Sequence, residues 1–135
     1  MSIYCVKSKD LKWEKFFGID INIEAMDLLR KVKTAIVSDS KMLEHMGASF
    51  EVWDPTPPLK WHFNYEAIIH ILWGGPLKMT CEGKTHTAYQ GDFIIITKDS
   101  DAVLEVGGHL VFATVTHPPV DVIKRILDEK HQKKR

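Results

Sequence analysis

The second half of the chain is a series of short apolar segments separated by glycine turns, and this pattern constrains the fold more than any other feature. From residue 48 to residue 117 the segments follow one another without a helical pattern between them. Glycines mark the turns at positions 74–75, 83, 91 and 107–108. Many short strands at this spacing predict an all-β sandwich or barrel.

The predicted strands are TAIVSD (34–39), ASFEVWD (48–54), WHFNYEAIIHIL (61–72), PLKMTCE (76–82), THTAY (85–89), DFIIIT (92–97), AVLEV (102–106) and HLVFATVT (109–116). The segment DPTPPLK (54–60) is predicted to interrupt them, because proline cannot donate a ladder hydrogen bond. Helices are expected near residues 25–32 and over 121–135, the second with Asp121 as N-cap. The predicted organisation is therefore an N-terminal part (1–34) packing on the barrel, a barrel (35–118), and a C-terminal helix with a basic tail (119–135).

Composition limits the partners that the chain is expected to have. Its 135 residues include 18 basic and 18 acidic side chains, which gives no electrostatic reason to expect nucleic acid. No segment is long and apolar enough to span a bilayer, and the first residues lack the pattern of a secretory signal. Cys5 and Cys81 form neither a metal-type pair nor a disulfide framework. A cytoplasmic protein without membrane association is expected.

Residues 61–73 separate into a dry face and a half-polar face, because successive side chains of a strand point to opposite sides. The dry face holds Trp61, Phe63, Tyr65, Ala67, Ile69, Ile71 and Trp73. The other face holds His62, Asn64, Glu66, Ile68, His70 and Leu72. The dry face is expected to point into the barrel.

The half-polar face carries side chains of the kinds that bind metals, but their spacing argues against a metal site. His62, Glu66 and His70 lie on it, and imidazole with carboxylate is a ligand set for zinc or iron. Residues four apart on a strand lie ~13 Å apart along it, so these three do not converge on one ion unaided. We interpret this face as the solvent side of an outer strand and expect no metal and no other cofactor.

The dry face leaves two interpretations open, a plain hydrophobic core or the lining of a ligand pocket. Three inward aromatics in a row, directly after a proline-rich loop, would suit a pocket at the mouth of a small barrel. Cys81 is expected to face inward with Met79 on the next strand, as a packing thiol and not a nucleophile. The predicted pocket residues are Trp61, Phe63, Tyr65, Ile69, Met79 and Cys81.

Three segments resemble the cupin family: WHFNYEAIIHILWGG (61–75), EGKTHTAYQGDFIIIT (82–97) and HLVFATVTHPP (109–119). They are most similar to the EutQ-type cupins of ethanolamine utilisation. The residues that fit that family's pattern in order are Trp61, Asn64, Tyr65, Leu72, Gly74 and Gly91-Asp92. The resemblance covers residues 35–118 and implies a single-domain cupin-type β-barrel, or jelly roll, to which the C-terminal helix is added.

The chain departs from the metal-binding cupins at the positions that hold their metal. Those places carry Trp61, Phe63, Ala67 and Ala102. The resemblance therefore implies a metal-independent barrel. EutQ-type proteins have inward acids where this chain has Ala67, Ile69 and Trp73, so the acetate kinase activity assigned to some of them remains only a further alternative.

Two functional hypotheses follow. In the first, a metal-free barrel binds a small, largely apolar or aromatic molecule against the aromatic row of Trp61, Phe63 and Tyr65. In the second, the protein is a cofactor-independent isomerase, lyase or cyclase in which Tyr65 acts as acid or base, assisted by Glu66 or by a histidine from a nearby strand, His86 or His109. An inward histidine or carboxylate facing Tyr65 would favour the second hypothesis.

A homodimer is expected, because single cupins commonly pair through N-terminal strands and thereby cover open sheet edges. The predicted contact combines residues 4–17 with the half-apolar outer face of Ile68, His70 and Leu72.

Overall fold

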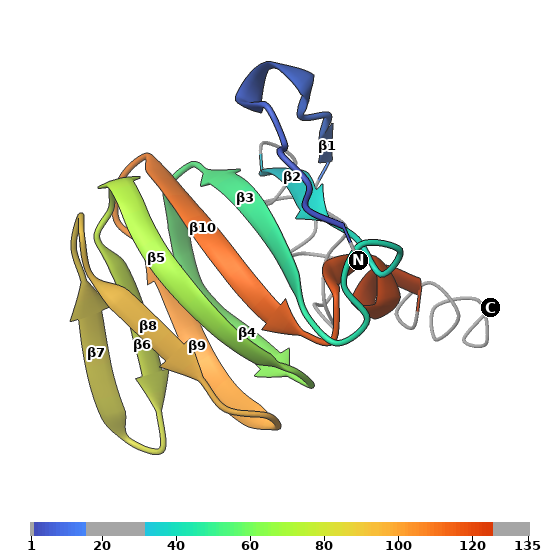
Figure 1. Ribbon diagram of the computed structural model, residues 1–135. Helices are drawn as coiled ribbons and strands as arrows, with labels where there is room; N and C mark the ends of the chain where they lie inside the picture. Colours follow the sequence, from blue (N-terminus) through green and yellow to red (C-terminus); the bar gives the residue numbers. More distant parts are fainter. Residues whose placement is uncertain (1, 16–31, 126–135) are drawn as a thin grey trace, which may run out of the picture.

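The computed structural model describes residues 2–15 and 32–125, and most of these residues form β-strands (Figure 1). The strands are β1 (Trp13–Lys15), β2 (Lys33–Ser38), β3 (Gly47–Trp53), β4 (Thr56–Phe63), β5 (Glu66–Gly74), β6 (Leu77–Cys81), β7 (Lys84–Ala88), β8 (Phe93–Ile96), β9 (Ser100–Val106) and β10 (Leu110–His117). A short 3-10 turn, η1 (Ser8–Asp10), precedes them, and residues 120–125 are helical. The prediction of an all-β fold with a C-terminal helix is confirmed.

The strands form two antiparallel sheets that face each other (Figure 1). The six-stranded sheet has the order β1-β2-β3-β10-β5-β8, and the four-stranded sheet has the order β4-β9-β6-β7. The chain crosses between the layers where β3 gives way to β4 and again where β4 gives way to β5. Two facing sheets with such crossings make a double-layered jelly roll, which encloses an interior.

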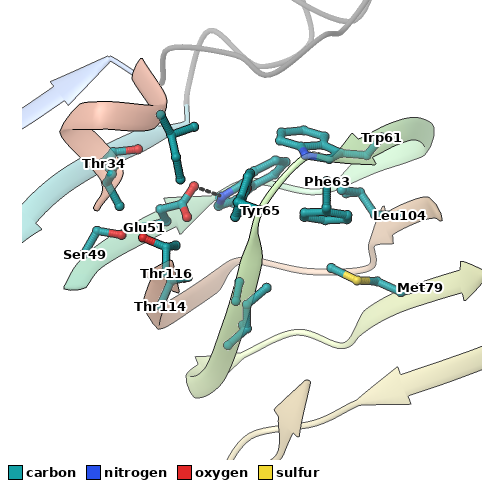
Figure 2. A pocket seen from close by; sticks show the side chains of 15 residues that line it. Thr34, Ser49, Glu51, Trp61, Phe63, Tyr65, Met79, Leu104, Thr114 and Thr116 are labelled. Atoms are coloured by element: carbon teal, nitrogen blue, oxygen red, sulfur yellow. Dashed lines mark hydrogen bonds between the residues drawn. The ribbon is translucent and has the colours of Figure 1, made fainter. Parts of the chain in front are cut away.

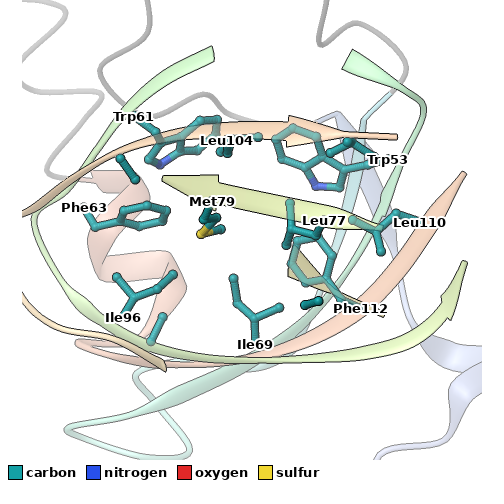
Figure 3. Packing of buried hydrophobic residues seen from close by; sticks show 14 of the residues in the cluster. Trp53, Trp61, Phe63, Ile69, Leu77, Met79, Ile96, Leu104, Leu110 and Phe112 are labelled. Atoms are coloured by element: carbon teal, nitrogen blue, oxygen red, sulfur yellow. The ribbon is translucent and has the colours of Figure 1, made fainter. Parts of the chain in front are cut away.

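The inner faces of both sheets share one hydrophobic core (Figure 3). Trp53 of the six-stranded sheet joins the layers, because its ring centroid lies 5.8 Å from that of Trp61 in the four-stranded sheet. The same indole lies 6.4 Å from the ring of Phe112 on β10. Each large apolar side chain buried in this way contributes about 1.5–3 kcal/mol, so the core can support a cavity inside it.

A helix that begins at Val120 packs against one end of the two sheets (Figure 1). Val120 and Ile123 are buried there. The carbonyl of Pro119 accepts hydrogen bonds from the N–H groups of Val122 and Ile123, so Pro119 precedes the first turn. The prediction of Asp121 as N-cap was wrong, because its carboxylate instead accepts hydrogen bonds from the N–H and Oγ of Ser40 at 2.9 and 2.6 Å.

Strand β4 differs from the prediction at both of its ends. It runs through the prolines at positions 57–58, where a break was expected. An edge strand tolerates proline, and β4 is the edge of its sheet, with a register shift between Thr56 and Leu59. The predicted continuous strand over 61–72 is in fact divided between β4 and β5, which lie in different sheets.

The alternation along β5 holds as far as Ile71 and then reverses. Strand β10 pairs Phe112 with Ile71 but pairs Val111 with Trp73, so β5 carries one extra residue at Leu72. Such a bulge changes which face the following side chains occupy. Trp73 is 55 % exposed, and its predicted place on the dry face was wrong.

Two predicted features, the helix near 25–32 and the tail over 126–135, fall largely or wholly outside the described residues. None of the helical structure within 2–15 and 32–125 has the length and apolar character needed to cross a membrane.

Candidate functional site

The aromatic row lies inside the barrel where β4 gives way to β5. The side chains of Trp61, Phe63 and Tyr65 are 5, 4 and 8 % exposed. Ring centroids are 6.0 Å apart between Trp61 and Phe63, and 5.7 Å apart between Phe63 and Tyr65. Together with Trp53 from β3, these rings form a continuous group that we call the aromatic wall.

A cavity of about 60 Å³ lies against the aromatic wall, between the two sheets and the C-terminal helix (Figure 2). Of the predicted pocket residues, those that line it are Trp61, Phe63, Tyr65, Ile69 and Met79. The row is therefore the wall of a cavity and not only packing. Cys81 does not line this cavity; it is partly buried and borders a neighbouring groove with His86 and Phe93.

Glu51 supplies the cavity with a carboxyl group that was not among the predicted site residues. Strand β3 contributes Ser49, Glu51 and Trp53 to the lining of the cavity. Figure 2 shows Ser49 and Glu51 on this strand. Glu51 as a whole is only half-buried, but its carboxyl end lies inside. This burial raises the pKa of Glu51 from 4.5 to about 7, while a hydrogen bond from Trp53 Nε1 at 3.3 Å opposes the increase.

Alternation alone could not identify Glu51, because both faces of β3 are mixed. Phe50 and Val52 make one face more apolar, and Trp53 stands on the other together with Glu51. The available signal was the shared parity of Glu51 and Trp53, since a tryptophan at a strand end is usually buried.

Tyr65 faces the same cavity, with its hydroxyl in a dry environment. Burial raises the pKa of Tyr65 well above its usual value, the negative charge of Glu51 adds to the increase, and the Trp61 indole opposes it. The phenol therefore keeps its proton at all ordinary pH values. It can donate a hydrogen bond or a proton, but it does not serve as a base.

Three threonine hydroxyls lie at the Glu51 side of the cavity. Thr34 is the register partner of Glu51 on β2, and Thr114 and Thr116 follow each other on the inner face of β10. Their Oγ1 atoms are buried and have no hydrogen-bond partner within 2–15 and 32–125. Buried hydroxyls are normally paired, so this cluster indicates a place for an additional polar partner.

The described residues that line the cavity can give it a negative charge but no positive charge. Among its lining residues in the described part of the chain there is no lysine, arginine or histidine. Within 2–15 and 32–125, its titratable groups are Glu51 and Tyr65. The arrangement can bind a neutral or cationic group and can exchange a proton through Glu51, but it offers no countercharge to an anion.

The other predicted acid–base residues lie outside the barrel. The Glu66 carboxylate is exposed and lies 3.1 Å from His117 Nδ1. His109 Nδ1 lies 3.2 Å from an Asp54 oxygen, and His86 is exposed on β7. None of these groups faces Tyr65 as the hypothesis of an assisting acid or histidine required, whereas Glu51 does.

The outer histidines do not form a metal site with Glu66. His70 stacks on Phe93 with ring centroids 4.1 Å apart, and His62 Nδ1 lies 2.7 Å from Asp101 Oδ1. No group of three histidine, cysteine, aspartate or glutamate side chains in the described residues is placed to hold an ion. The positions that match cupin metal ligands carry side chains without a ligating atom, so the residues do not fit that metal.

Comparisons with known proteins agree on the fold and the family. A family model described as ethanolamine utilisation protein EutQ matches residues 3–122. A putative ethanolamine utilization protein Q from Salmonella typhimurium LT2 is 29% identical over 64% of this chain and 69% of that chain, with a TM-score of 0.58. The EutQ protein of Clostridium difficile is 22% identical over 82% of this chain and 89% of that chain, with a TM-score of 0.62.

Similarity in fold extends beyond these two proteins. The polyketide cyclase RemF from Streptomyces resistomycificus is 16% identical over 86% of this chain and 80% of that chain, with a TM-score of 0.62. At this identity the likeness shows the fold alone. Comparison with proteins of curated function gave no significant match. Since the family model spans most of the sequence and the two facing sheets match the solved structures, the chain belongs to the EutQ family and has the cupin fold.

Proposed function

We propose that this protein binds a small organic molecule inside the cupin barrel, without a metal ion. The apolar part of the ligand packs against the aromatic wall, and its polar end meets Glu51 and the threonine hydroxyls. The observation that carries the proposal is the Glu51 carboxyl, which shares an interior cavity with three hydroxyls that lack a partner in the described residues. A region that served packing alone would be lined by apolar groups.

The same lining narrows the alternatives from the sequence. A largely apolar ligand would pack against the aromatic wall but would leave Glu51 and the threonine hydroxyls without a partner. We therefore modify the hypothesis of a largely apolar or aromatic ligand to a ligand with one polar end. An acetate kinase activity gains no support, because acetate and phosphate are anions and the lining described above offers no basic side chain.

A second candidate function is proton-transfer catalysis, and the pKa of Glu51 favours it. A carboxyl group with a pKa of about 7 is populated in both protonation states at neutral pH, as a general acid–base group requires. Glu51 would then exchange the proton and Tyr65 would donate a hydrogen bond to an oxygen of the substrate. This assignment keeps the isomerase, lyase or cyclase hypothesis, but Glu51 replaces Glu66 as the assisting group and takes over the proton transfer that was assigned to Tyr65.

Native mass spectrometry of the purified protein, combined with elemental analysis, tests the proposed function. We expect a small organic adduct or none, with zinc, iron, nickel and manganese well below one equivalent. A metal near one equivalent that is lost in a His62→Ala or His70→Ala variant would contradict metal independence. Loss of an organic adduct in Glu51→Gln, but not in the outer-face control Glu105→Gln, would place the ligand in the barrel.

We also propose that the protein is a cytoplasmic homodimer. The outer face of β5 and β8 supports this association, because its apolar side chains are exposed; they are Ile68, Leu72, Trp73, Phe93 and Ile95. Soluble monomers seldom expose a contiguous apolar patch of this kind. Strand β8 is also the edge of its sheet and has free ladder positions for a partner.

A further inference from the structure

The walls of the cavity also specify the charge of its ligand, if the cavity binds a small molecule as proposed above. An ionisable carboxyl group and a wall of aromatic rings border the same space. We propose that the ligand is a small organic ammonium ion, held between the Glu51 carboxylate and the aromatic wall.

The aromatic wall has the chemistry that binds such an ion. Its neighbouring ring centroids are 5.8 Å apart for Trp53 and Trp61, 6.0 Å for Trp61 and Phe63, and 5.7 Å for Phe63 and Tyr65. The faces of tryptophan, tyrosine and phenylalanine attract a cation within about 6 Å of the ring centroid, and tryptophan does so most strongly. Alkylated ammonium ions are the ligands that clustered aromatic rings recognise in many proteins.

Glu51 supplies the countercharge directly beside this wall. The indole N–H of Trp53 holds Oε1 of Glu51 at 3.3 Å, so the carboxyl group is fixed next to the first ring (Figure 2). A cation in the cavity can therefore contact the aromatic wall and the adjacent carboxylate together. The hydroxyls of Thr34, Thr114 and Thr116 accept hydrogen bonds from an ammonium N–H or pair with a hydroxyl of the ligand.

Among the described residues, the other neighbours of Glu51 do not compete for the cation. The elements packed around it present Thr34 from β2, Thr114 and Thr116 from β10, and Val120 and Ile123 from the helix. In the part of the chain that the structure describes, the titratable group that faces it is Tyr65, which stays neutral because its pKa is raised. In the described residues, Glu51 alone gives the cavity its charge. A cavity of about 60 Å³ has room for about four water-sized groups, so the ligand has only a few non-hydrogen atoms.

This arrangement couples binding to a proton. An ammonium ion binds the carboxylate form of Glu51, so below a pKa of about 7 binding releases the proton that the free site holds. Affinity for the cation should then rise about tenfold from pH 6 to pH 8. A neutral ligand that accepts a hydrogen bond from the protonated carboxyl group would show the opposite trend.

Calorimetric titration of the full chain with tetramethylammonium chloride, tert-butanol and sodium acetate tests the proposal. The first two probes have similar size and differ in charge, and the third carries the opposite charge. Titrations are made at pH 6, 7 and 8 at constant ionic strength, in two buffers with different enthalpies of ionisation. We expect tetramethylammonium to bind most tightly, to gain about tenfold in affinity between pH 6 and pH 8, and to release a proton at pH 6.

Variants separate the carboxylate from the fold. Glu51→Gln should weaken tetramethylammonium binding at least about tenfold and remove its pH dependence, whereas the outer-face control Glu105→Gln should change neither. If Glu51→Gln does not fold, the proton that the wild type releases on binding tetramethylammonium at pH 6 tests the role of the carboxylate. Tighter binding of tert-butanol or acetate would overturn the ammonium proposal and leave small-molecule binding in place. Absence of binding by all three probes, with no organic adduct in native mass spectrometry, would overturn both.

Discussion

The indole N–H of Trp53 donates a hydrogen bond to Oε1 of Glu51 across 3.3 Å, and both side chains extend from the same face of β3 into the barrel. This pair joins the two chemical halves of the cavity, since Trp53 belongs to the aromatic wall and Glu51 to the polar side. A neutral donor of this kind fixes the orientation of the carboxyl group without supplying a countercharge. The effect of burial on the pKa of Glu51 therefore outweighs that of the hydrogen bond, and the acid titrates near neutral pH.

The stability of the protein should depend on pH through Glu51. Its pKa is about 7 when folded and 4.5 when unfolded, so the folded state holds the proton more tightly. The resulting contribution, about 3 kcal/mol, is fully present below pH 4.5 and is lost as pH rises through 7. Glu51→Gln should abolish this part of the pH dependence in urea unfolding, and Glu105→Gln should retain it. If the free energy of unfolding depended on pH in the same way in the wild type and in Glu51→Gln, this would contradict the buried position of the acid.

Replacing Thr114 by valine should stabilise the empty protein and weaken ligand binding. The change keeps the shape of the side chain and removes a buried hydroxyl that lacks a partner in the described residues. Removing such a group recovers about 1–3 kcal/mol of desolvation cost in the free energy of unfolding. Thr87→Val on the exposed face of β7 is the matched control and should leave both quantities nearly unchanged. A destabilised Thr114→Val variant would show that the hydroxyl is satisfied without a ligand.

Tyr65→Phe distinguishes binding from catalysis. The substitution keeps the ring in the aromatic wall and removes only the hydroxyl. In a binding protein the loss should be one hydrogen bond to the ligand, about 0.5–1.5 kcal/mol in binding free energy. In an enzyme in which Tyr65 donates a hydrogen bond to the substrate oxygen while Glu51 exchanges the proton, turnover should fall about a hundredfold or more while the fold is unchanged. Unchanged binding and turnover would remove Tyr65 from both accounts.

Much of the fold could be predicted from sequence because its signals are local. The glycine turns and short apolar segments specified most strands of both sheets, and the alternation from Trp61 to Ile71 identified the inward side chains correctly. Trp73 did not follow the alternation, because β5 has a bulge opposite Val111 and Phe112. This bulge depends on the pairing with a strand nearly forty residues away in sequence, and no local pattern contains that register. The prolines of β4 were misleading for a similar reason, since only the sheet order shows that β4 is an edge.

The candidate site was predicted only in its apolar half. The aromatic row was recognisable in the sequence as three alternating rings, whereas the polar half combines residues of β2, β3 and β10. Thr34, Glu51 and Thr114 are individually ordinary residues of half-polar strands. Their shared position follows from the pairing of β2 and β10 with β3, which sequence alternation does not determine. Glu66 was the nearest acid to Tyr65 in sequence, and strand parity places it on the opposite face.

A homodimer should form through the outer face of β5 and β8. Phe93 and Ile95 are 62 and 75 % exposed on the edge strand β8. Ile95→Asp should shift the molar mass from dimer to monomer in light scattering, because a charge would be buried in an apolar contact. The control Thr87→Asp, on the exposed face of β7, should leave the mass unchanged. A wild-type monomer at working concentration would refute the association.

The ionisation of Glu51 decides whether the proposed site exists, because that site depends on a carboxyl group buried inside the barrel. The side-chain carboxyl carbon of Glu51 can be followed by carbon-13 NMR from pH 4 to pH 9, and its resonance is assigned by its absence in Glu51→Gln. A carboxyl group buried in this way should titrate with a midpoint near pH 7 in the free protein. A midpoint near 4.5, the value of an ordinary exposed glutamate, would show that the carboxyl group lies in water and would contradict the proposed site.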